Sequence, residues 1–265
     1  MKVLARFFAC LFFSLCLMFF FNASELTNAI AGVPCTAPDN GSGTANIPAS
    51  CPYTNPSGTI DIINGLAVGD QLNSQGTFDS FFDITYSVGG SLGGAIEQFK
   101  GLLTLVMSGT GSLSGFNRTI PMDMQCVTHS APRTSGNPVQ SFDTDMFQLQ
   151  GQVTGDPDFD LLRITAGTGF GLPSPGHTTL TQLPGGDWNV DSFFDITYRI
   201  DFVGAPGGTL AGRSGSTTAT IRMQQGMPVA LGRICVRKYF DRNHNQQLDP
   251  SEQPMGGVTF GILDP

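Results

Sequence analysis

The chain has 265 residues, of which 13% are charged, and its formal net charge at pH 7 is −8. An acidic chain whose few lysines and arginines form no basic run repels polyphosphate, which argues against nucleic acid as a partner. The 34 glycines and 17 prolines favour short strands joined by tight turns over long helices.

The N-terminus has the pattern of a secretory signal. Basic residues flank the start of an apolar run over residues 7–21, which is shorter than the roughly 20 residues that span a bilayer. Small residues ending at Ala31 predict cleavage there, with Ala23 as an alternative. We therefore expect residues 1–31 to be a signal peptide and the mature chain to be secreted, extracellular or at the cell surface. The peptide is the one membrane contact we expect, unless it stays as an uncleaved anchor.

Four of the six cysteines follow the signal peptide, and an even number in an exported chain suggests disulfides. Cys35 and Cys51 enclose most of a polar segment, residues 32–56, which a local bridge would hold in place. Cys126 and Cys235 would pair with each other or remain buried thiols. The sequence leaves all three connectivities open.

An internal repeat organises the middle of the chain. The octapeptide DSFFDITY occurs at residues 79–86 and again at residues 191–198, and each copy is followed by a similar strand-like segment, at 118–125 and 218–224. An identical run of eight residues indicates a duplication. The duplicated region is then residues 57–230. Its first copy is about residues 57–130, and its second copy is about residues 165–228.

Both octapeptides alternate apolar and polar residues with period two, which predicts half-buried strands. In the first copy one face carries Phe82, Ile84, Tyr86 and Val88, and the other carries Phe81, Asp83, Thr85 and Ser87. In the second copy the apolar face runs through Phe194, Ile196, Tyr198, Ile200 and Phe202. Further strands are expected at residues 59–63, 102–107, 145–153 and 159–165, whereas residues 95–103 could form a short helix.

Turn signals rich in glycine and proline separate these runs. The predicted fold class is therefore all-β: one or two antiparallel β-sandwiches with an internal duplication, followed by the first strands of another module. The repeated Asp83 and Asp195 could be read as paired catalytic or metal-binding carboxylates. We favour a structural interpretation, because an Asp on the polar face of an exposed strand needs no chemistry.

The C-terminal segment, residues 231–265, contains an acidic loop between two apolar strand-like runs. From Gly232 onward it resembles the N-terminal part of an SdrD B-like domain, which is related to the collagen-adhesin B-type modules of bacterial surface proteins. The resemblance implies a strand, a calcium loop and a second strand. The matching residues are Gly232, Phe240, Asp241, Asn243, Asn245, Asp249, Glu252, Pro254, Gly257, Val258, Leu263 and Asp264.

Calcium prefers six to eight oxygen ligands, which alternate positions of a twelve-residue loop can supply. Counting from Asp241, the ligand positions 1, 3, 5, 7, 9 and 12 are Asp241, Asn243, Asn245, Gln247, Asp249 and Glu252. Position 7 uses its backbone carbonyl, and position 6, usually Gly, is Gln246 here, which should weaken binding. Calcium is the predicted cofactor. The competing interpretation is a polar hairpin connection that binds nothing.

The sequence leaves two alternative functions open. Residues 89–93 fit the G-x-S-x-G pattern around Ser91 of serine hydrolases, but such a match arises easily in a Gly- and Ser-rich chain. The three histidines lie in the calcium loop or in Pro/Gly-rich connections. A glycan-binding sandwich using Trp188 on a turn is the other alternative. We expect an exported, non-catalytic adhesin, stalk or envelope component, with surface proteins or glycans as further partners.

Overall fold

The computed structural model describes residues 34–226 of the chain. The predicted signal peptide and the calcium loop lie outside these residues. The described part consists of antiparallel strands and two short 3₁₀ turns, η1 (Gly111–Leu113) and η2 (Thr168–Phe170), and it contains no α-helix. No helix in this part is long and apolar enough to cross a membrane. The all-β, antiparallel prediction is therefore confirmed.

Eleven strands form the sheet, and several are long. They are β1 (Thr36–Ala37), β2 (Tyr53–Thr54), β3 (Ile60–Ile62), β4 (Leu72–Val88), β5 (Ala95–Gly109), β6 (Asn117–Ser130), β7 (Val139–Thr154), β8 (Phe159–Ala166), β9 (Pro175–Gln182), β10 (Trp188–Gly204) and β11 (Ser214–Gly226). The helix considered for residues 95–103 is wrong, because this segment belongs to β5. This strand pairs with β4 and β6, and alternate side chains along it are buried.

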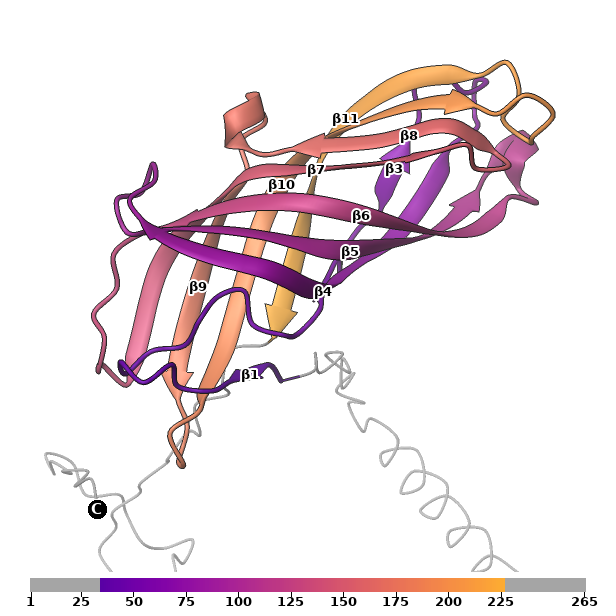
Figure 1. Cartoon of the computed structure of the whole chain (residues 1–265). Coiled ribbons are helices and arrows are strands. Elements are labelled where there is room, and N and C mark those ends of the chain that lie inside the picture. The colour runs from indigo at the N-terminus through magenta and orange to yellow at the C-terminus, as the bar shows by residue number, and fades with distance from the viewer. Residues whose placement is uncertain (1–33, 227–265) are drawn as a thin grey trace, which may run out of the picture. The chain divides into compact units, whose positions relative to one another are not determined.

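All strands belong to one sheet and not to separate sandwich sheets. The order β10, β11, β2, β4, β5, β6, β7, β8 returns to its start, because β10 pairs with β11 over residues 191–203 and with β8 over residues 198–204. Strands this long twist and curve enough for the two ends of the sheet to meet. Figure 1 shows β4, β5 and β6 crossing in front of β9, β10 and β11.

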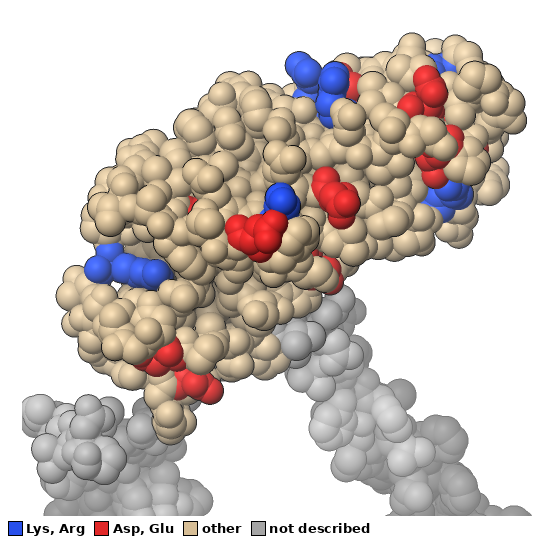
Figure 2. All heavy atoms as spheres, viewed as in Figure 1, with Lys and Arg blue, Asp and Glu red and all other residues tan. Residues whose placement is uncertain are grey.

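The main hydrophobic core lies inside this closed sheet. On β10 the predicted apolar face is buried from Phe194 to Phe202, as period two requires. Tyr53, Phe78 and Phe159 belong to the same core, and the ring centroids of Tyr53 and Phe194 are 5.8 Å apart. The outer surface carries only scattered small groups of charged side chains on the face shown in Figure 2.

The first octapeptide does not repeat this conformation. Ser80 (φ 55°) and Asp83 (φ 53°) lie in the left-handed region, and the pairing of β4 with β5 shifts between Asp79 and Phe82 and again between Phe82 and Thr85. Each bulge changes which face the following side chains occupy. As a result Phe82 is 47% exposed, and the predicted burial of its face is wrong.

The neighbouring strands explain this difference between identical sequences. Beyond Phe78, β4 pairs with β5 alone, because β2 ends its pairing there, so residues 79–88 form an edge. β10 is instead flanked by β11 on one side and by β8 and β9 on the other. Bulges are common on exposed edges, where they discourage pairing with other chains. Over the second octapeptide, the pairing of β10 with β11 is regular from Asp191 to Tyr198.

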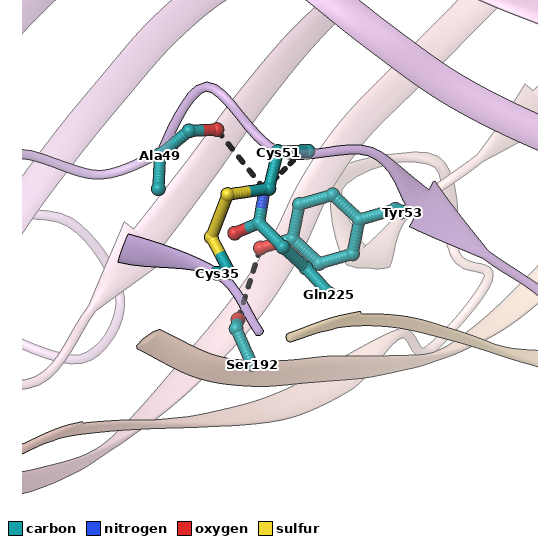
Figure 3. The surroundings of a disulfide bond; sticks show 6 residues. All are labelled: Cys35, Ala49, Cys51, Tyr53, Ser192 and Gln225. Carbon is teal, nitrogen blue, oxygen red and sulfur yellow. Dashed lines mark hydrogen bonds between the residues drawn. A yellow bond between two sulfur atoms is a disulfide. The ribbon is translucent and has the colours of Figure 1, made fainter. Parts of the chain in front are cut away.

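The N-terminal segment packs on one end of the sheet and is held by a disulfide between Cys35 and Cys51, which confirms the predicted local bridge. Gln225 on β11 donates its side-chain amide to the carbonyls of Ala49 and Cys51, and the Tyr53 hydroxyl lies 2.9 Å from Ser192 Oγ (Figure 3). These partners belong to the second copy of the repeat region, and β2 of the same segment pairs with β4 of the first copy. Cys126 is a free, buried thiol on β6, and burial raises its pKa.

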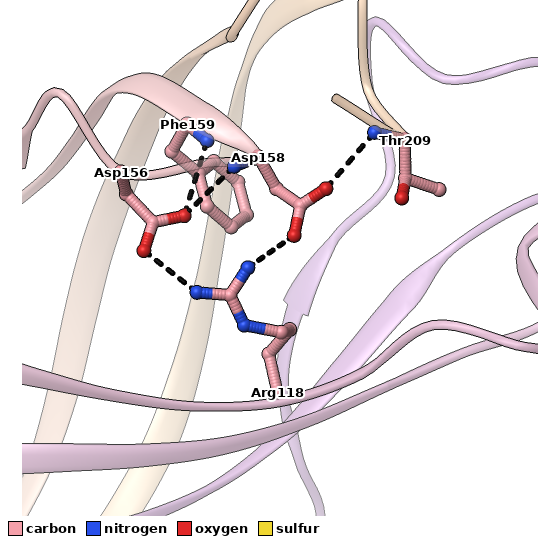
Figure 4. A network of polar contacts seen from close by, with 5 residues as sticks. All are labelled: Arg118, Asp156, Asp158, Phe159 and Thr209. Carbon is pink, nitrogen blue, oxygen red and sulfur yellow. Dashed lines mark hydrogen bonds and ion pairs between the residues drawn. The ribbon is translucent and has the colours of Figure 1, made fainter. Parts of the chain in front are cut away.

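A charged network connects the start of β6 with the β7–β8 turn and the β10–β11 turn. The Arg118 guanidinium donates to Asp156, at 2.7 Å, and to Asp158, whose other oxygen accepts the Thr209 backbone N–H at 2.9 Å (Figure 4). Burial by itself would raise the pKa of Asp158. The Thr209 N–H and Arg118 outweigh it, so the pKa lies below the usual value.

This depressed pKa predicts how stability depends on pH. A carboxyl group whose pKa is lowered by folding stabilises the fold above its unfolded pKa of about 3.9, and that contribution disappears as the pH falls through the folded value. Asp158→Asn keeps the bond to Thr209 but loses the ion pair. It should cost about 1–3 kcal/mol at pH 7.

The difference between the wild-type chain and Asp158→Asn in urea unfolding should shrink towards zero below about pH 4. The exposed neighbour Asp160 provides the control, because Asp160→Asn should leave the stability unchanged at either pH. A pH-independent difference for Asp158→Asn would contradict the assignment.

Candidate functional site

The predicted calcium ligands Asp241, Asn243, Asn245, Gln247, Asp249 and Glu252 lie outside the described residues. Within residues 34–226, no group of three or more His, Cys, Asp or Glu side chains is arranged to hold a metal ion. The calcium loop therefore stays a prediction from the sequence.

The repeated Asp83 and Asp195 have separate cross-strand partners. Lys100 Nζ lies 2.8 Å from Asp83, and Arg222 donates two bonds of 2.7 Å to Asp195. Arg222 lowers the pKa of Asp195. Both aspartates lie in ion pairs on the outer face of the sheet, which supports the structural interpretation over paired catalytic carboxylates.

Trp188 cannot stack on a glycan, so that alternative is wrong in its choice of residue. Trp188 is the first residue of β10, and its side chain is fully buried. It packs in a small core with Leu180, Val190 and apolar residues of the N-terminal segment. Its indole N–H donates to Asp39 Oδ2 at 3.0 Å, and this bond lowers the pKa of Asp39. Trp188 therefore anchors the N-terminal segment to the sheet.

Ser91 has a histidine partner, although the context differs from a hydrolase. Ser91 Oγ lies 2.9 Å from His129 Nδ1, which also accepts the Ser91 backbone N–H at 3.1 Å. His129 lies on β6 and not in a connection, and its ring stacks on Phe147. Ser91 itself sits in a turn between strands β4 and β5, whereas a nucleophile elbow joins a strand to a helix.

The backbone donors around Ser91 are also engaged. The N–H groups of Gly89, Gly93 and Gly94 each donate to a carbonyl oxygen of the turn or of β6. Acyl transfer needs donors directed at the developing oxyanion and an acidic partner that orients the histidine. Neither is found for this pair among residues 34–226. The contact fixes the hairpin on β6.

The tertiary structure assembles a second serine–histidine group that the sequence did not reveal. Ser141 Oγ lies 2.7 Å from His177 Nε2, and His177 Nδ1 lies 2.9 Å from Asp143 Oδ1. His177 is on β9, again not in a connection, opposite Asp143 on β7. The two contacts join serine, histidine and aspartate in the same order as the nucleophile, base and acid of a catalytic triad, and both distances are within hydrogen-bonding range.

The surroundings of Ser141 argue against catalysis. The Asp143 side chain is 77% exposed and that of His177 37%. On an open sheet face water solvates the carboxylate, so the imidazolium would gain little from it. Ser141 also lies within a paired strand, whereas the serine of a nucleophile elbow lies on a sharp turn from a strand to a helix. We interpret the group as a row of cross-strand hydrogen bonds.

The interior of the sheet contains a polar cluster on β5, β6 and β7. Glu97 accepts hydrogen bonds from the hydroxyls of Thr128, at 2.8 Å, and Ser130, at 2.9 Å, and Thr144 Oγ1 nearby has no partner. These side chains line an otherwise apolar cavity of about 50 Å³. Small-molecule sites typically measure about 300–1,000 Å³. The cavity is too small to serve as such a site without rearrangement.

Sequence reasoning missed both serine–histidine contacts and Glu97 for the same reason. Ser141 and Asp143 alternate along one segment, and His177 and Thr179 along another, but only the pairing register brings the segments together. Alternation was the one available signal. It does not say which strand lies alongside which.

Comparison with protein-family models, with curated proteins and with solved structures finds no match to this chain.

Proposed function

We propose that this chain is an exported, non-catalytic protein of the cell surface or extracellular space, acting as an adhesin, stalk or envelope component. The observation that carries the proposal is the Cys35–Cys51 disulfide, in a chain that also begins with a secretory pattern. Disulfides persist in oxidising compartments outside the cytosol. The open surroundings of Ser91 and Ser141 support a non-catalytic role.

The long closed sheet suits a mechanical role. Strands β10 and β11 have 17 and 13 residues and form a continuous antiparallel ladder of thirteen consecutive pairs. The predicted internal duplication is part of this proposal. In it, the present sheet originated from a duplicated sandwich unit. The copies have diverged in topology, because β10 pairs directly with β11, whereas β5 lies between β4 and β6.

The calcium-stiffened module is the second part of the proposal, and it rests on the ligand spacing from Asp241 to Glu252. With three carboxylates among its ligands and Gln246 at the sharp turn, the loop should have a dissociation constant of about 10⁻⁴ to 10⁻³ M, as in extracellular modules. Calcium would then stiffen the segment that follows the sheet.

Calorimetric titration of the full chain with calcium tests this module. We expect one site, and a gain of about 1–3 kcal/mol in the stability of the C-terminal part when calcium reaches about 10–100 times its dissociation constant. Asp241→Ala should abolish both effects. Asp187→Ala, which removes an exposed carboxylate from the β9–β10 turn, should abolish neither. Absence of any calcium response would refute the metal assignment.

A further inference from the structure

The outer face of the sheet is hollowed where β4 to β8 lie side by side. Two adjoining depressions of about 340 Å³ and 360 Å³ share Gln125 and Gln150 and together cross all five strands. Four inter-strand spacings of about 4.8 Å make this groove roughly 19 Å long. We call it the glutamine groove. Its glutamines are Gln98, Gln125, Gln148, Gln150 and Gln152.

The pairing registers place these side chains in rows across the strands. Lys100 on β5 lies opposite Gln125 on β6, which lies opposite Gln150 on β7. In a parallel row, Gln152 on β7 lies opposite Arg163 on β8. Directly opposed residues have neighbouring side chains. The amides therefore form a continuous polar strip that a chain-like ligand could follow across the sheet.

The five amide side chains are available to a ligand. None of them hydrogen-bonds to another residue of the described range 34–226. An amide offers two donors and one acceptor with two lone pairs, so the groove presents both kinds of group along its whole length. A ligand rich in hydroxyls, which also donate and accept, is the natural complement.

The charge of the groove is balanced. It contains two acidic residues, Asp83 and Asp123, and two basic residues, Lys100 and Arg163. Lys100 is paired with Asp83, and Arg163 with Asp201 at 3.0 Å. A strongly anionic or cationic polymer would find no complementary field here.

From this chemistry we propose that the glutamine groove binds a neutral polysaccharide chain. A peptide that adds to a sheet pairs with a free strand edge, and the groove meets such an edge only at its β4 end. A ligand that crosses β5, β6 and β7 meets strands with neighbours on both sides, which suits a peptide less. The proposal concerns residues far in sequence from the calcium loop and does not depend on calcium.

Affinity electrophoresis of the full chain tests the proposal. Native gels contain hydroxyethyl cellulose, mannan or galactomannan as neutral probes, or alginate as an anionic probe, all with EDTA. We expect retardation in at least one neutral gel. The double variant Gln125→Ala with Gln150→Ala removes the side chains shared by both depressions, and its affinity should fall by about tenfold or more.

Gln182→Ala with Gln224→Ala is the matched control, because it removes two glutamines from β9 and β11, outside the groove. It should be retarded like the wild type. Circular dichroism melting of both variants checks that the sheet is intact. The proposal is overturned if no neutral gel retards the chain, if retardation occurs only in alginate, or if the two double variants behave alike. Because EDTA is present, failure of the calcium proposal would leave this result unaffected.

Discussion

Phe194→Ala should lower the free energy of unfolding by about 3–5 kcal/mol, whereas Phe82→Ala should lower it by less than about 1 kcal/mol. The two residues occupy the same position of the same octapeptide. Phe194 is buried in the core, with its ring near that of Tyr53. Phe82 is 47% exposed on the β4 edge, where its main neighbour is the Lys100 ammonium, 5.8 Å from the ring centroid.

Urea unfolding of the two variants, followed by far-ultraviolet circular dichroism, measures this difference directly. Removing a buried phenylalanine loses its transfer free energy and leaves a cavity that the sheet can close only in part. Removing an exposed one does neither. Equal losses for the two variants would mean that the first octapeptide is buried like the second, and the assigned bulges at Ser80 and Asp83 would be wrong.

Replacing both Cys35 and Cys51 by alanine should cost about 3 kcal/mol, the loop-closure entropy expected for a bridge across some 15 residues. The sequence separation of the two cysteines is 16. The bridged segment has few strand pairs of its own, since β1 and β2 contain two residues each. Its ordering therefore depends on the bridge, on Trp188 and on the Gln225 amide.

Thermal unfolding with and without a reductant provides the internal control for the disulfide. The reductant should lower the melting temperature of the wild-type chain towards that of the double variant and should leave the double variant unchanged. Cys126 cannot mimic the effect, because it is a buried free thiol. A wild-type melting temperature that does not respond to complete reduction would show that packing alone holds the N-terminal segment.

The sequence by itself determined the strand content of this protein. Period-two alternation and the glycine-rich turns predicted strands within β3 to β8, β10 and β11, and the buried face of β10 from Phe194 to Phe202. They missed β9 and the strand conformation of residues 95–101. Cysteine spacing and the polarity of the intervening segment identified the Cys35–Cys51 bridge as a candidate. These features are local, because alternation, turns and short loops depend on residues close together in the chain.

Tertiary structure decided which strands are neighbours. The bulges, the closure of the sheet and the cross-strand contacts follow from these neighbours. The octapeptide DSFFDITY is regular in β10 and bulged in β4, because β10 lies between paired strands and β4 has a free edge. Closure of the sheet through β8 and β10, the Ser141–His177 contact and the glutamine groove all arise from pairings between distant segments. Backbone hydrogen bonding follows the same pattern for any two antiparallel strands. Alternation within one segment therefore shows which side chains share a face, but not which distant segment pairs with it.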